Sequence, residues 1–448
     1  MHRFPLVVLL CALALTGRSQ EKPPVSSLSW EERKNTSLSN ITPGIPAFGK
    51  TEVLYKQNGN DKYKVTLGQP VVVTVADKAV GWGYFQFPSL YRSVDGSLVA
   101  SWAMHSDHAE SYGKDSNGYA LSTDGGKTWT PHPGSRPLGD GLVLPNGDRI
   151  KNYTPAALDT STLKLPKKVG TTPETYGRSF SYYKVDELPE KLQGVYINRL
   201  KKGQKEWTLE HNQLIDPTAV RYTDDKLFPL VWWGDMRVEA TKAIMTGTYP
   251  GFSIQNGKVA ASGVHFYRST DQGKTWKIVG RIPYAPDLTH DPNGNKRLAL
   301  GFTEPAFEIL KDGSYLCVLR TTDGLGNSPM YVSRSTDKGA TWSHPKAFTS
   351  SGVLPKLLQL SNGVTALASG RPGMQLRFST TSNGLQWTDA FEMLPFGDPK
   401  DAVSCGYPEL LPTGPDKFLL IYSDFKYKNE KGEIRKAIKV REITVSPR

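Results

Sequence analysis

The sequence has little cysteine and no long hydrophobic run beyond its first residues. It contains three cysteines in 448 residues, and Cys11 lies in the apolar N-terminal run, so Cys317 and Cys405 can form at most one disulfide. A disulfide framework is therefore excluded, and a chain of this length can bury a core large enough to hold its fold. No run approaches the roughly 20 apolar residues of a membrane-spanning helix. Helical periodicity is also scarce, which disfavours an α-helical fold.

The N-terminus has the pattern of an export signal. It reads MHRFPLVVLLCALALTGRSQ, with a basic start followed by an apolar run from Pro5 to Leu15. This run is too short to cross a bilayer, and small and polar residues follow it. We therefore predict a signal peptide over 1–20, an N-terminal extension over 21–48 and one domain over 49–448. The expected protein is secreted or periplasmic and has no integral membrane segment.

The chain is basic, with 55 Lys and Arg against 43 Asp and Glu and a formal net charge of +12. A basic exported protein favours anionic partners such as acidic glycans. The positive charge is scattered along the chain, and no nucleic-acid motif accompanies it. The charge pattern therefore predicts a glycan rather than a nucleic acid as the partner.

One short motif recurs along the chain. STDGGKTW spans 122–129, STDQGKTW spans 269–276 and STDKGATW spans 335–342, and weaker copies end at Trp207 and Trp387. A catalytic centre is needed once, so a segment that occurs several times is better interpreted as structural. In such a motif the Ser and Asp can bond to the backbone of their own turn, the Gly supplies a positive φ, and the Trp packs between strands.

A second repeat interleaves with the first. Six segments share an apolar strand, a tight D-G or N-G type turn and another apolar strand, which is typical of a β-hairpin; they begin at Pro88, near Leu142, and at Ala219, Pro305, Pro355 and Pro408. Five of the six precede a motif that ends in Trp. Six units of four short strands predict an all-β fold, a six-bladed β-propeller of four-stranded antiparallel blades.

The pattern S-x-D-x-G-x-T-W resembles the Asp-box, or BNR repeat, and several copies in a six-hairpin chain resemble the sialidase (neuraminidase) superfamily. The resemblance covers roughly Gly81 to Ser423. It implies a site at the central axis, built from the inner strands, with the Asp-boxes on the periphery of the opposite face.

Three further segments resemble the catalytic segments of that superfamily. GFTEPAFEILKDGSYLCVLRT carries Glu304 and Arg320, SGRPGMQLRFS carries Arg371, and CGYPELL carries Tyr407. The resemblance implies that Tyr407 is the nucleophile, Glu304 its base, and the two arginines the ligands of a substrate carboxylate. The chemistry is consistent with this, because a neutral tyrosine avoids the repulsion that an anionic nucleophile would meet from a carboxylate on the anomeric carbon. Guanidinium groups bind carboxylates in bidentate fashion, and no cofactor is required.

The match fails at one place. The superfamily has an R-x-P motif on the first inner strand, whereas this chain reads YFQFPSL with Gln86 in the place of the arginine. Gln86 is expected to bind substrate through hydrogen bonds without charge. Since a charge-assisted bond contributes roughly 1.5–3 kcal/mol, its loss weakens carboxylate binding by one to two orders of magnitude. A different cation such as Arg92, or a different ligand, would be needed to compensate.

The general acid is expected in the loop MHSDHAESYGKDSNG, where Asp107, Glu110 and Asp115 are all available. Asp107 is favoured because it lies near the end of the strand. The flanking His105 and His108 leave a metal site as an alternative, although no metal is predicted.

The Trp232–Trp233 pair and the residues Asp235 to Arg237 are expected on a long insertion in the third blade, which could form the rim of the site.

Three functions remain open at this point. The first is a secreted sialidase-like exo-glycosidase that releases a terminal acidic sugar, a sialic acid or related 2-keto acid, with retention through a tyrosine nucleophile. The second is the same fold acting on another sugar, which Gln86 favours. The third is a propeller that binds glycans or proteins without catalysis, against which the pairing of Glu304 with Tyr407 counts.

Overall fold

The computed structural model describes most of the chain after residue 55. The described residues are 56–57, 60–61, 63–114, 116–171, 180–296, 299–323, 328–371, 373–379, 381, 383–388, 390–395 and 402–447. The predicted signal peptide and extension, and Asp115, lie outside them. The described part is all-β, and its helices are short 3-10 turns: η2 (Ala109–Ser111), η3 (Thr160–Thr162), η4 (Val185–Glu187) and η5 (Glu190–Leu192). In this part of the chain no helix has the length and apolar character needed to cross a membrane.

Three separate antiparallel sheets have four strands each, and each begins with a predicted hairpin. The residues of the hairpin turns stabilise the turns locally. At Asp312–Gly313, for example, the Asp carboxylate accepts a hydrogen bond from the Ser314 backbone N–H at 2.9 Å, and Gly313 has a φ of +81°. The strands are β5 (Tyr84–Arg92), β6 (Leu98–Met104), β7 (Asn117–Ser122) and β8 (Thr130–Pro131); β24 (Gly301–Ile309), β25 (Tyr315–Thr322), β26 (Met330–Ser335) and β27 (Lys346–Thr349); and β28 (Val353–Gln359), β29 (Thr365–Gly370), β30 (Met374–Ser379) and β31 (Phe391–Leu394).

The middle of the chain forms one sheet of eight strands, in the order β18-β19-β22-β23-β15-β14-β10-β9. Two antiparallel groups of four are joined by a parallel pairing of β15 with β23, in which Leu214 lies opposite Trp276. The sequence predicted separate four-stranded sheets, whereas here two such groups form one continuous sheet. The strands are β9 (Leu142–Val143), β10 (Arg149–Asn152), β14 (Val195–Leu200), β15 (Thr208–Ile215), β18 (Trp233–Val238), β19 (Ile244–Gly251), β22 (Gly263–Ser269) and β23 (Thr275–Ile282).

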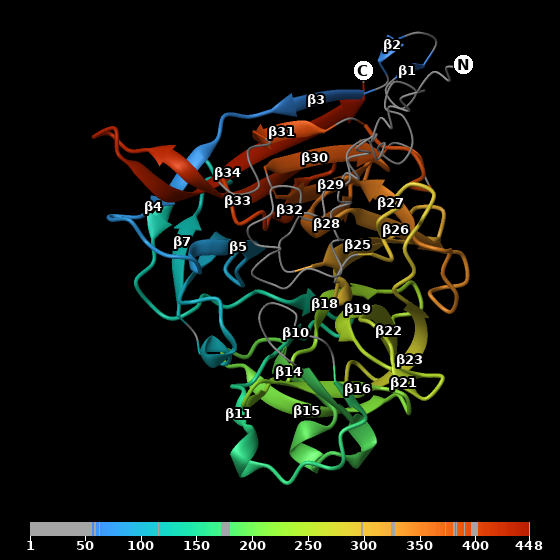
Figure 1. Ribbon diagram of the computed structural model, residues 1–448. Helices are drawn as coiled ribbons and strands as arrows, with labels where there is room; N and C mark the ends of the chain where they lie inside the picture. The colour runs from blue at the N-terminus through green and yellow to red at the C-terminus, as the bar shows by residue number, and fades with distance from the viewer. Residues whose placement is uncertain are drawn as a thin grey trace, which may run out of the picture.

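The two ends of the described chain meet in one sheet. β3 (Tyr63–Leu67) and β4 (Val71–Val75) both pair with β34 (Ile434–Pro447), which continues to β33 (Lys417–Lys428) and β32 (Glu409–Gly414). Figure 1 shows the blue N-terminal strands beside the red C-terminal ones. This pairing ties the start of the domain to its end.

One predicted hairpin lies in a different place from the one expected. The segment that begins at Ala219 forms β16 (Val220–Asp224) and β17 (Leu227–Phe228), which belong to a five-stranded sheet outside the main sheets, visible in green at the bottom of Figure 1. The hairpin of the main sheet is instead β18–β19, so the expectation that Trp233 to Arg237 lie on an insertion is wrong. The remaining short strands are β11 (Leu158–Asp159), β12 (Gly170–Thr171), β13 (Phe180–Lys184), β20 (Ile254–Gln255), β21 (Lys258–Val259), β1 (Lys56–Gln57) and β2 (Asn60–Asp61).

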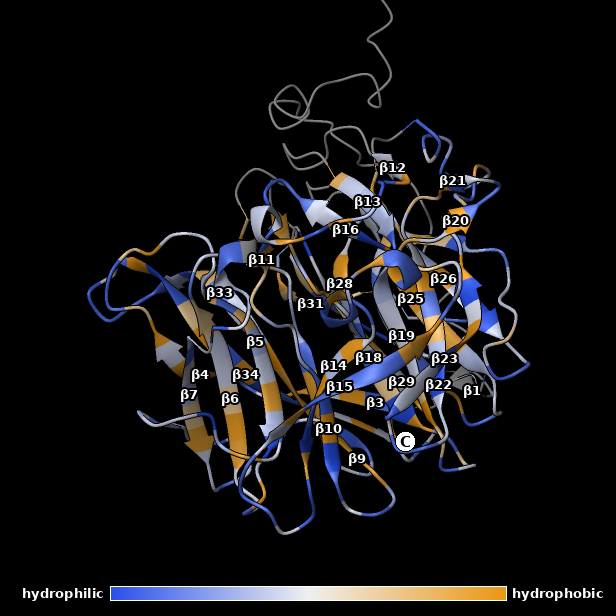
Figure 2. Cartoon of the chain, turned by 90° about the horizontal axis from the view of Figure 1, so that it is seen from below, coloured by the Kyte–Doolittle hydropathy of each residue, from blue (hydrophilic) through white to orange (hydrophobic). Residues whose placement is uncertain are grey.

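The first strands of successive sheets lie next to one another, in the order β18, β24, β28, β32 and β5. Between the sheets lies the hydrophobic core, and Figure 2 shows hydrophobic residues along the strands and hydrophilic ones on many connecting loops. Cys317 and Cys405 are buried and free, so the possible disulfide is not formed. Packing between sheets, rather than cross-linking, holds the fold.

The STD repeats have the structural role that their recurrence predicts. In the first copy, Asp124 accepts a hydrogen bond from Ser122 Oγ at 2.8 Å and from the backbone N–H of Thr128 at 3.0 Å. Gly126 has a φ of +93°, and the indole N–H of Trp129 donates to its carbonyl oxygen at 3.1 Å. The motif is therefore a closed turn.

Each repeat also packs against a neighbouring group of strands, the first copy against β33 and the third against β19 and β22. In the third copy, the indole of Trp342 stacks on Phe266 of β22 with ring centroids 4.2 Å apart. Gly339 has a φ of +84°, which favours glycine, and a Cβ there would lie 2.4 Å from Cε of Met245 in β19 and would displace that side chain. The repeats brace neighbouring sheets against each other.

Candidate active site

Five of the six predicted site residues line one cavity of about 840 Å³, and these are Asp107, Glu304, Arg320, Arg371 and Tyr407. They occupy equivalent edges of the hairpins, since each lies near the start of a first strand or near the end of a second strand. The first strands of neighbouring sheets contact one another, and residues far apart in the sequence therefore converge.

Glu304, Tyr407 and Arg320 form a hydrogen-bonded cluster at the base of this cavity. The hydroxyl of Tyr407 donates a short hydrogen bond to Oε1 of Glu304. Nη1 of Arg320 lies 2.8 Å from the same carboxylate oxygen and donates to the Tyr407 oxygen at 3.1 Å. Glu304 and Arg320 are 7% and 5% exposed, so this ion pair is shielded from bulk water.

The electrostatics of the cluster set the resting charges. Burial raises the pKa of Glu304, but the charge and hydrogen bonds of Arg320 outweigh it, so that the net pKa lies below its ordinary value. Burial, together with the nearby charge of Glu304, raises the pKa of Tyr407 well above its ordinary value. At neutral pH the carboxylate is thus ionised and the phenol neutral, an arrangement in which a base is hydrogen-bonded to the proton of a nucleophile.

The backbone is bent where these side chains enter the cavity. Glu304 has a φ of +43°, and the pairing of β24 with β25 shifts register between Thr303 and Ala306. The second carboxylate oxygen of Glu304 accepts a hydrogen bond from the backbone N–H of Leu354 at 3.1 Å. Positive φ at a residue other than glycine costs roughly 1–3 kcal/mol and is concentrated at functional sites. The bulge turns Glu304 toward Tyr407.

Two glycines bring Arg371 and Tyr407 together. A Cβ on Gly370 would lie 2.2 Å from Cα of Gly406, so the two backbones meet at a distance that only glycine allows. Arg371 donates from Nε to the carbonyl oxygen of Cys405 at 2.9 Å, and its guanidinium lies 5.7 Å from the centre of the Tyr407 ring. Its Nη groups can meet an anionic ligand beside the tyrosine.

Asp107 lies on the loop after β6 and lines the same cavity, whereas Glu110 does not line it. Asp107 is exposed, and its Oδ2 accepts a hydrogen bond from the indole N–H of Trp82 at 3.0 Å. The neighbouring His105 donates from Nδ1 to the carbonyl oxygen of Ser106 at 2.8 Å. Across the described residues, no three His, Cys, Asp or Glu side chains are grouped so that they could hold a metal ion.

The structure differs from the expectation for Gln86. Its side chain is 0% exposed and is absent from the cavity wall, and its Oε1 accepts a hydrogen bond from the Gly83 backbone N–H at 3.0 Å. The pairing of β5 with β6 shifts register on both sides of Gln86, and Phe85 and Phe87 have φ values of +54° and +49°. Phe87 therefore enters the cavity in its place and lies 5.0 Å from the Tyr407 ring, centre to centre.

An aromatic wall of the same cavity was missed by sequence reasoning. The Trp233 ring lies 5.5 Å from Tyr112 and 5.8 Å from Tyr249, centre to centre, and its indole N–H donates to Thr154 Oγ1 at 2.7 Å. All four residues line the cavity. Aromatic rings with a polar edge suit the apolar faces and hydroxyls of a sugar. Trp233 was noted in the sequence, but no signal marked Tyr249 or Tyr112.

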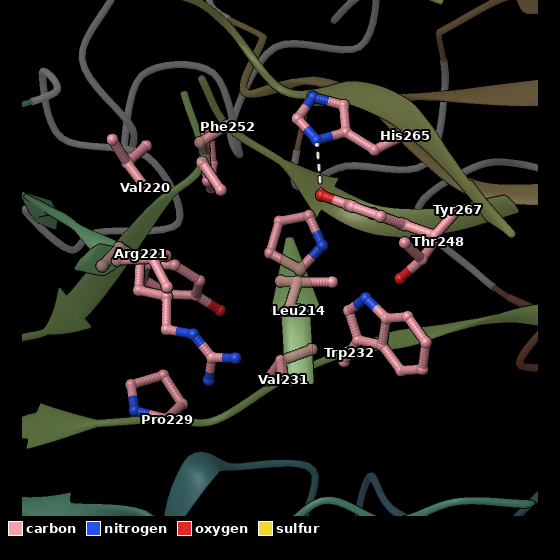
Figure 3. A pocket seen from close by; sticks show the side chains of 14 residues that line it. Leu214, Val220, Arg221, Pro229, Val231, Trp232, Thr248, Phe252, His265 and Tyr267 are labelled. Carbon is pink, nitrogen blue, oxygen red and sulfur yellow. Dashed lines mark hydrogen bonds between the residues drawn. The ribbon is translucent and has the colours of Figure 1, made fainter. Parts of the chain in front are cut away.

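Behind this wall lies a second, small cavity of about 30 Å³ (Figure 3). There His265 and Tyr267 are hydrogen-bonded, and Tyr267 donates to the buried Asp216 at 2.9 Å. Arg281 pairs with Asp216 at 2.5 Å. Burial lowers the pKa of His265 to about 3, so this ring stays neutral. Since Thr248 and Pro250 line this cavity and flank Tyr249, the buried network supports the aromatic wall.

No family model matches the chain, and no curated protein matches it in sequence. Among solved structures, a protein of unknown function from Dyadobacter fermentans is similar over 85% of this chain and 99% of its own, with 19% identity and a TM-score of 0.56. The chain therefore shares the fold of that protein.

More distant structural similarity is found to two glycosidases. An alpha-L-arabinanase from Penicillium chrysogenum aligns over 84% of this chain and 98% of its own, with 15% identity and a TM-score of 0.45. A sialidase from Streptococcus pneumoniae aligns over 84% and 70%, with 13% identity and a TM-score of 0.42.

Proposed function

We propose that the protein is an exported glycoside hydrolase of sialidase type, which releases a terminal acidic sugar with retention of configuration. The observation that carries the proposal is the Tyr407 hydroxyl, which donates to the ionised Glu304 and accepts from Arg320 inside one cavity. A binding protein has no need of a base hydrogen-bonded to a phenol that faces the cavity.

In the proposed first step, Glu304 takes the phenolic proton as the Tyr407 oxygen attacks the anomeric carbon. Because the pKa of Tyr407 is raised and that of Glu304 is lowered, the free enzyme holds a neutral phenol. Proton transfer must therefore accompany attack. Arg320, whose Nη1 lies 3.1 Å from the phenol oxygen, stabilises the charge that develops there.

In the same step Asp107 protonates the oxygen of the leaving group, and the glycosidic bond breaks. In the second step the ionised Asp107 takes a proton from water, which attacks the glycosyl-tyrosine. The sugar leaves with its original configuration, and the tyrosine proton returns from Glu304. Two inversions thus give net retention.

Arg371 and Arg320 are the proposed ligands of the substrate carboxylate, and the basic charge of the chain favours an acidic glycan.

We further propose that the eight-stranded sheet counts as two blades, which makes a six-bladed propeller around this site.

A second candidate is a neutral terminal sugar. The observation that favours it is Phe87, which lines the cavity where the sialidase resemblance implies an arginine, while Gln86 is buried. An aromatic face beside Tyr407 suits a sugar ring without a carboxylate.

The proposal is tested by incubating the purified protein with a mixed pool of sialoglycans and neutral glycans and identifying the released sugars by mass spectrometry. Release of a terminal 2-keto acid supports the first candidate, and release of a neutral sugar supports the second. Binding of a glycan without release of any sugar would contradict both. Recovery of the mature chain from the culture medium or periplasm would support export.

A further inference from the structure

Trp82 connects two parts of the candidate site that no backbone pairing joins. It lies in the turn before β5, lines the main cavity and is 45% exposed. Its indole N–H donates to Oδ2 of Asp107 at 3.0 Å, across 25 positions of sequence.

The face of the same indole carries the guanidinium of Arg371, whose Cζ lies 5.3 Å from the ring centre. Two further rings hold the indole at its edges: Phe87 at 6.4 Å and Phe425 at 6.2 Å, both in T-shaped geometry. Phe425 lies on β33 and Phe87 on β5, so two different sheets fix the orientation of the indole. The orientation of its N–H follows from this packing.

We propose that Trp82 is a positioning residue that orients the carboxyl of Asp107 for protonation of the leaving group. This inference rests on the proposed function, in which Asp107 is the general acid. An indole N–H can only donate, and in a protonated carboxyl group the carbonyl oxygen is a better acceptor than the hydroxyl oxygen, so the oxygen that meets the indole is the one without the proton. When Asp107 is protonated, its proton is therefore held on Oδ1, the oxygen that does not face Trp82.

The exposure of Asp107 makes this orientation necessary. Its side chain lies on a surface loop, and a carboxyl group in such a place would otherwise rotate among its rotamers. A misplaced acid contributes little, since a displacement of about 1 Å can cost roughly a hundredfold in rate. One N–H on a rigid ring selects both the rotamer and the proton-bearing oxygen.

The test compares two glycosides of the same sugar, one with an activated nitrophenol leaving group and one with an alkyl leaving group. A nitrophenol departs without protonation, whereas an alkoxide requires the acid. Trp82→Phe keeps an aromatic face for Arg371 and removes the N–H. We expect its kcat/KM on the alkyl glycoside to fall by roughly 10–100-fold. Its kcat/KM on the nitrophenyl glycoside should stay within about threefold of the wild type, because kcat/KM reports the first step, in which this leaving group needs no acid.

Trp342→Phe is the matched control, because it removes an indole N–H bond of 3.1 Å in an Asp-box outside the cavity. It should leave the ratio of the two rates unchanged. In an Asp107→Ala background, Trp82→Phe should change that ratio no further, since its effect passes through the carboxyl.

Equal falls on the two glycosides, or an undiminished effect of Trp82→Phe without Asp107, would contradict the role of Trp82 while leaving the proposed function standing. A wild-type protein that cleaves neither its acidic nor its neutral glycosides would contradict the proposed function and, with it, this role.

Discussion

The hydroxyl of Tyr407 donates a hydrogen bond to the carboxylate of Glu304, 103 positions away in the sequence. Two sheets meet at this contact: Glu304 lies in β24, and Tyr407 lies two residues before β32. Arg320 contacts both side chains and keeps the carboxylate ionised. The cluster thus holds a neutral phenol against an ionised carboxylate.

The acid limb of the pH profile should report Glu304. Because its pKa is lowered from 4.5, the carboxylate is ionised in the free enzyme above that value. We expect Glu304 to stay available as the base down to about pH 4.5, so that its loss lowers kcat/KM only below that pH. Stability follows the same sign: the contribution of this pair is present above the unfolded pKa and is lost as pH falls through the folded one. A limb near neutrality that disappears in Glu304→Gln would contradict the assignment.

Arg371 should decide between an acidic and a neutral substrate. Arg371→Met keeps much of the side-chain length but removes a charge-assisted bond that contributes roughly 1.5–3 kcal/mol. If the ligand carries a carboxylate, KM should rise by about 10–100-fold with a smaller change in kcat. Steady-state kinetics on the best substrate measure this. A KM that does not change would exclude carboxylate binding by Arg371 and favour the neutral sugar.

Asp271→Ala should reduce stability and leave turnover intact. Asp271 accepts hydrogen bonds from Ser269 Oγ at 2.7 Å and from the Thr275 backbone N–H at 2.9 Å within its STD repeat, and it does not line the main cavity. We expect the free energy of unfolding to fall by about 1 kcal/mol. Denaturant titration gives this value, and Lys274→Ala in the same turn is the control. Lost activity at an unchanged unfolding midpoint would be the opposite of what we expect.

Lys356 should stabilise the centre of the molecule. Its Nζ lies 3.2 Å from Glu409 of β32 and 3.6 Å from Asp235 of β18, so one cation on β28 connects two other strands. The two carboxylates outweigh its burial and raise its pKa. Lys356→Met should lower the free energy of unfolding by about 2 kcal/mol, since it leaves both carboxylates without this partner. An unchanged unfolding midpoint in denaturant would show that the pairing contributes nothing.

The sequence predicted the sheets best where turns are local. The hairpins at Asp312–Gly313 and Asn362–Gly363 have glycines at positive φ, and such turns are readable from the chain alone. The β18–β19 hairpin was missed because its turn has no glycine; Lys242, with a φ of +69°, takes that conformation instead. The parallel pairing of β15 with β23 depends on contacts far apart in sequence and has no local signal.

The sequence brought the residues at hairpin edges together, as the structure does, but it did not predict which side chain of β5 enters the cavity. Glu304, Arg320 and Tyr407 meet as the order of the hairpins implied. Gln86 was expected to face the ligand, but a register shift of β5 turns it inward and brings Phe87 out. A shift of one residue reverses the face of a strand, and no sequence pattern marked this one. Trp82 lies in the same aromatic segment, and no sequence pattern marked its contact with Asp107 either.

Tyr407→Phe separates chemistry from binding. The substitution removes the nucleophilic oxygen and keeps the ring that packs against Phe87. We expect kcat to fall by at least roughly 10²–10⁴-fold, the range typical of an acid–base or nucleophilic group, while the Kd for product changes little. Full activity in this variant would remove the tyrosine from the mechanism.

The central claim is tested most directly by trapping the covalent intermediate. A fluorinated glycoside of the released sugar with a good leaving group should form the intermediate faster than water breaks it down. Mass spectrometry of the intact protein should then show the added mass of one sugar, and peptide mapping should place it on Tyr407. No adduct should form in Tyr407→Phe. An adduct on another side chain, or a product of inverted configuration without any adduct, would contradict the account.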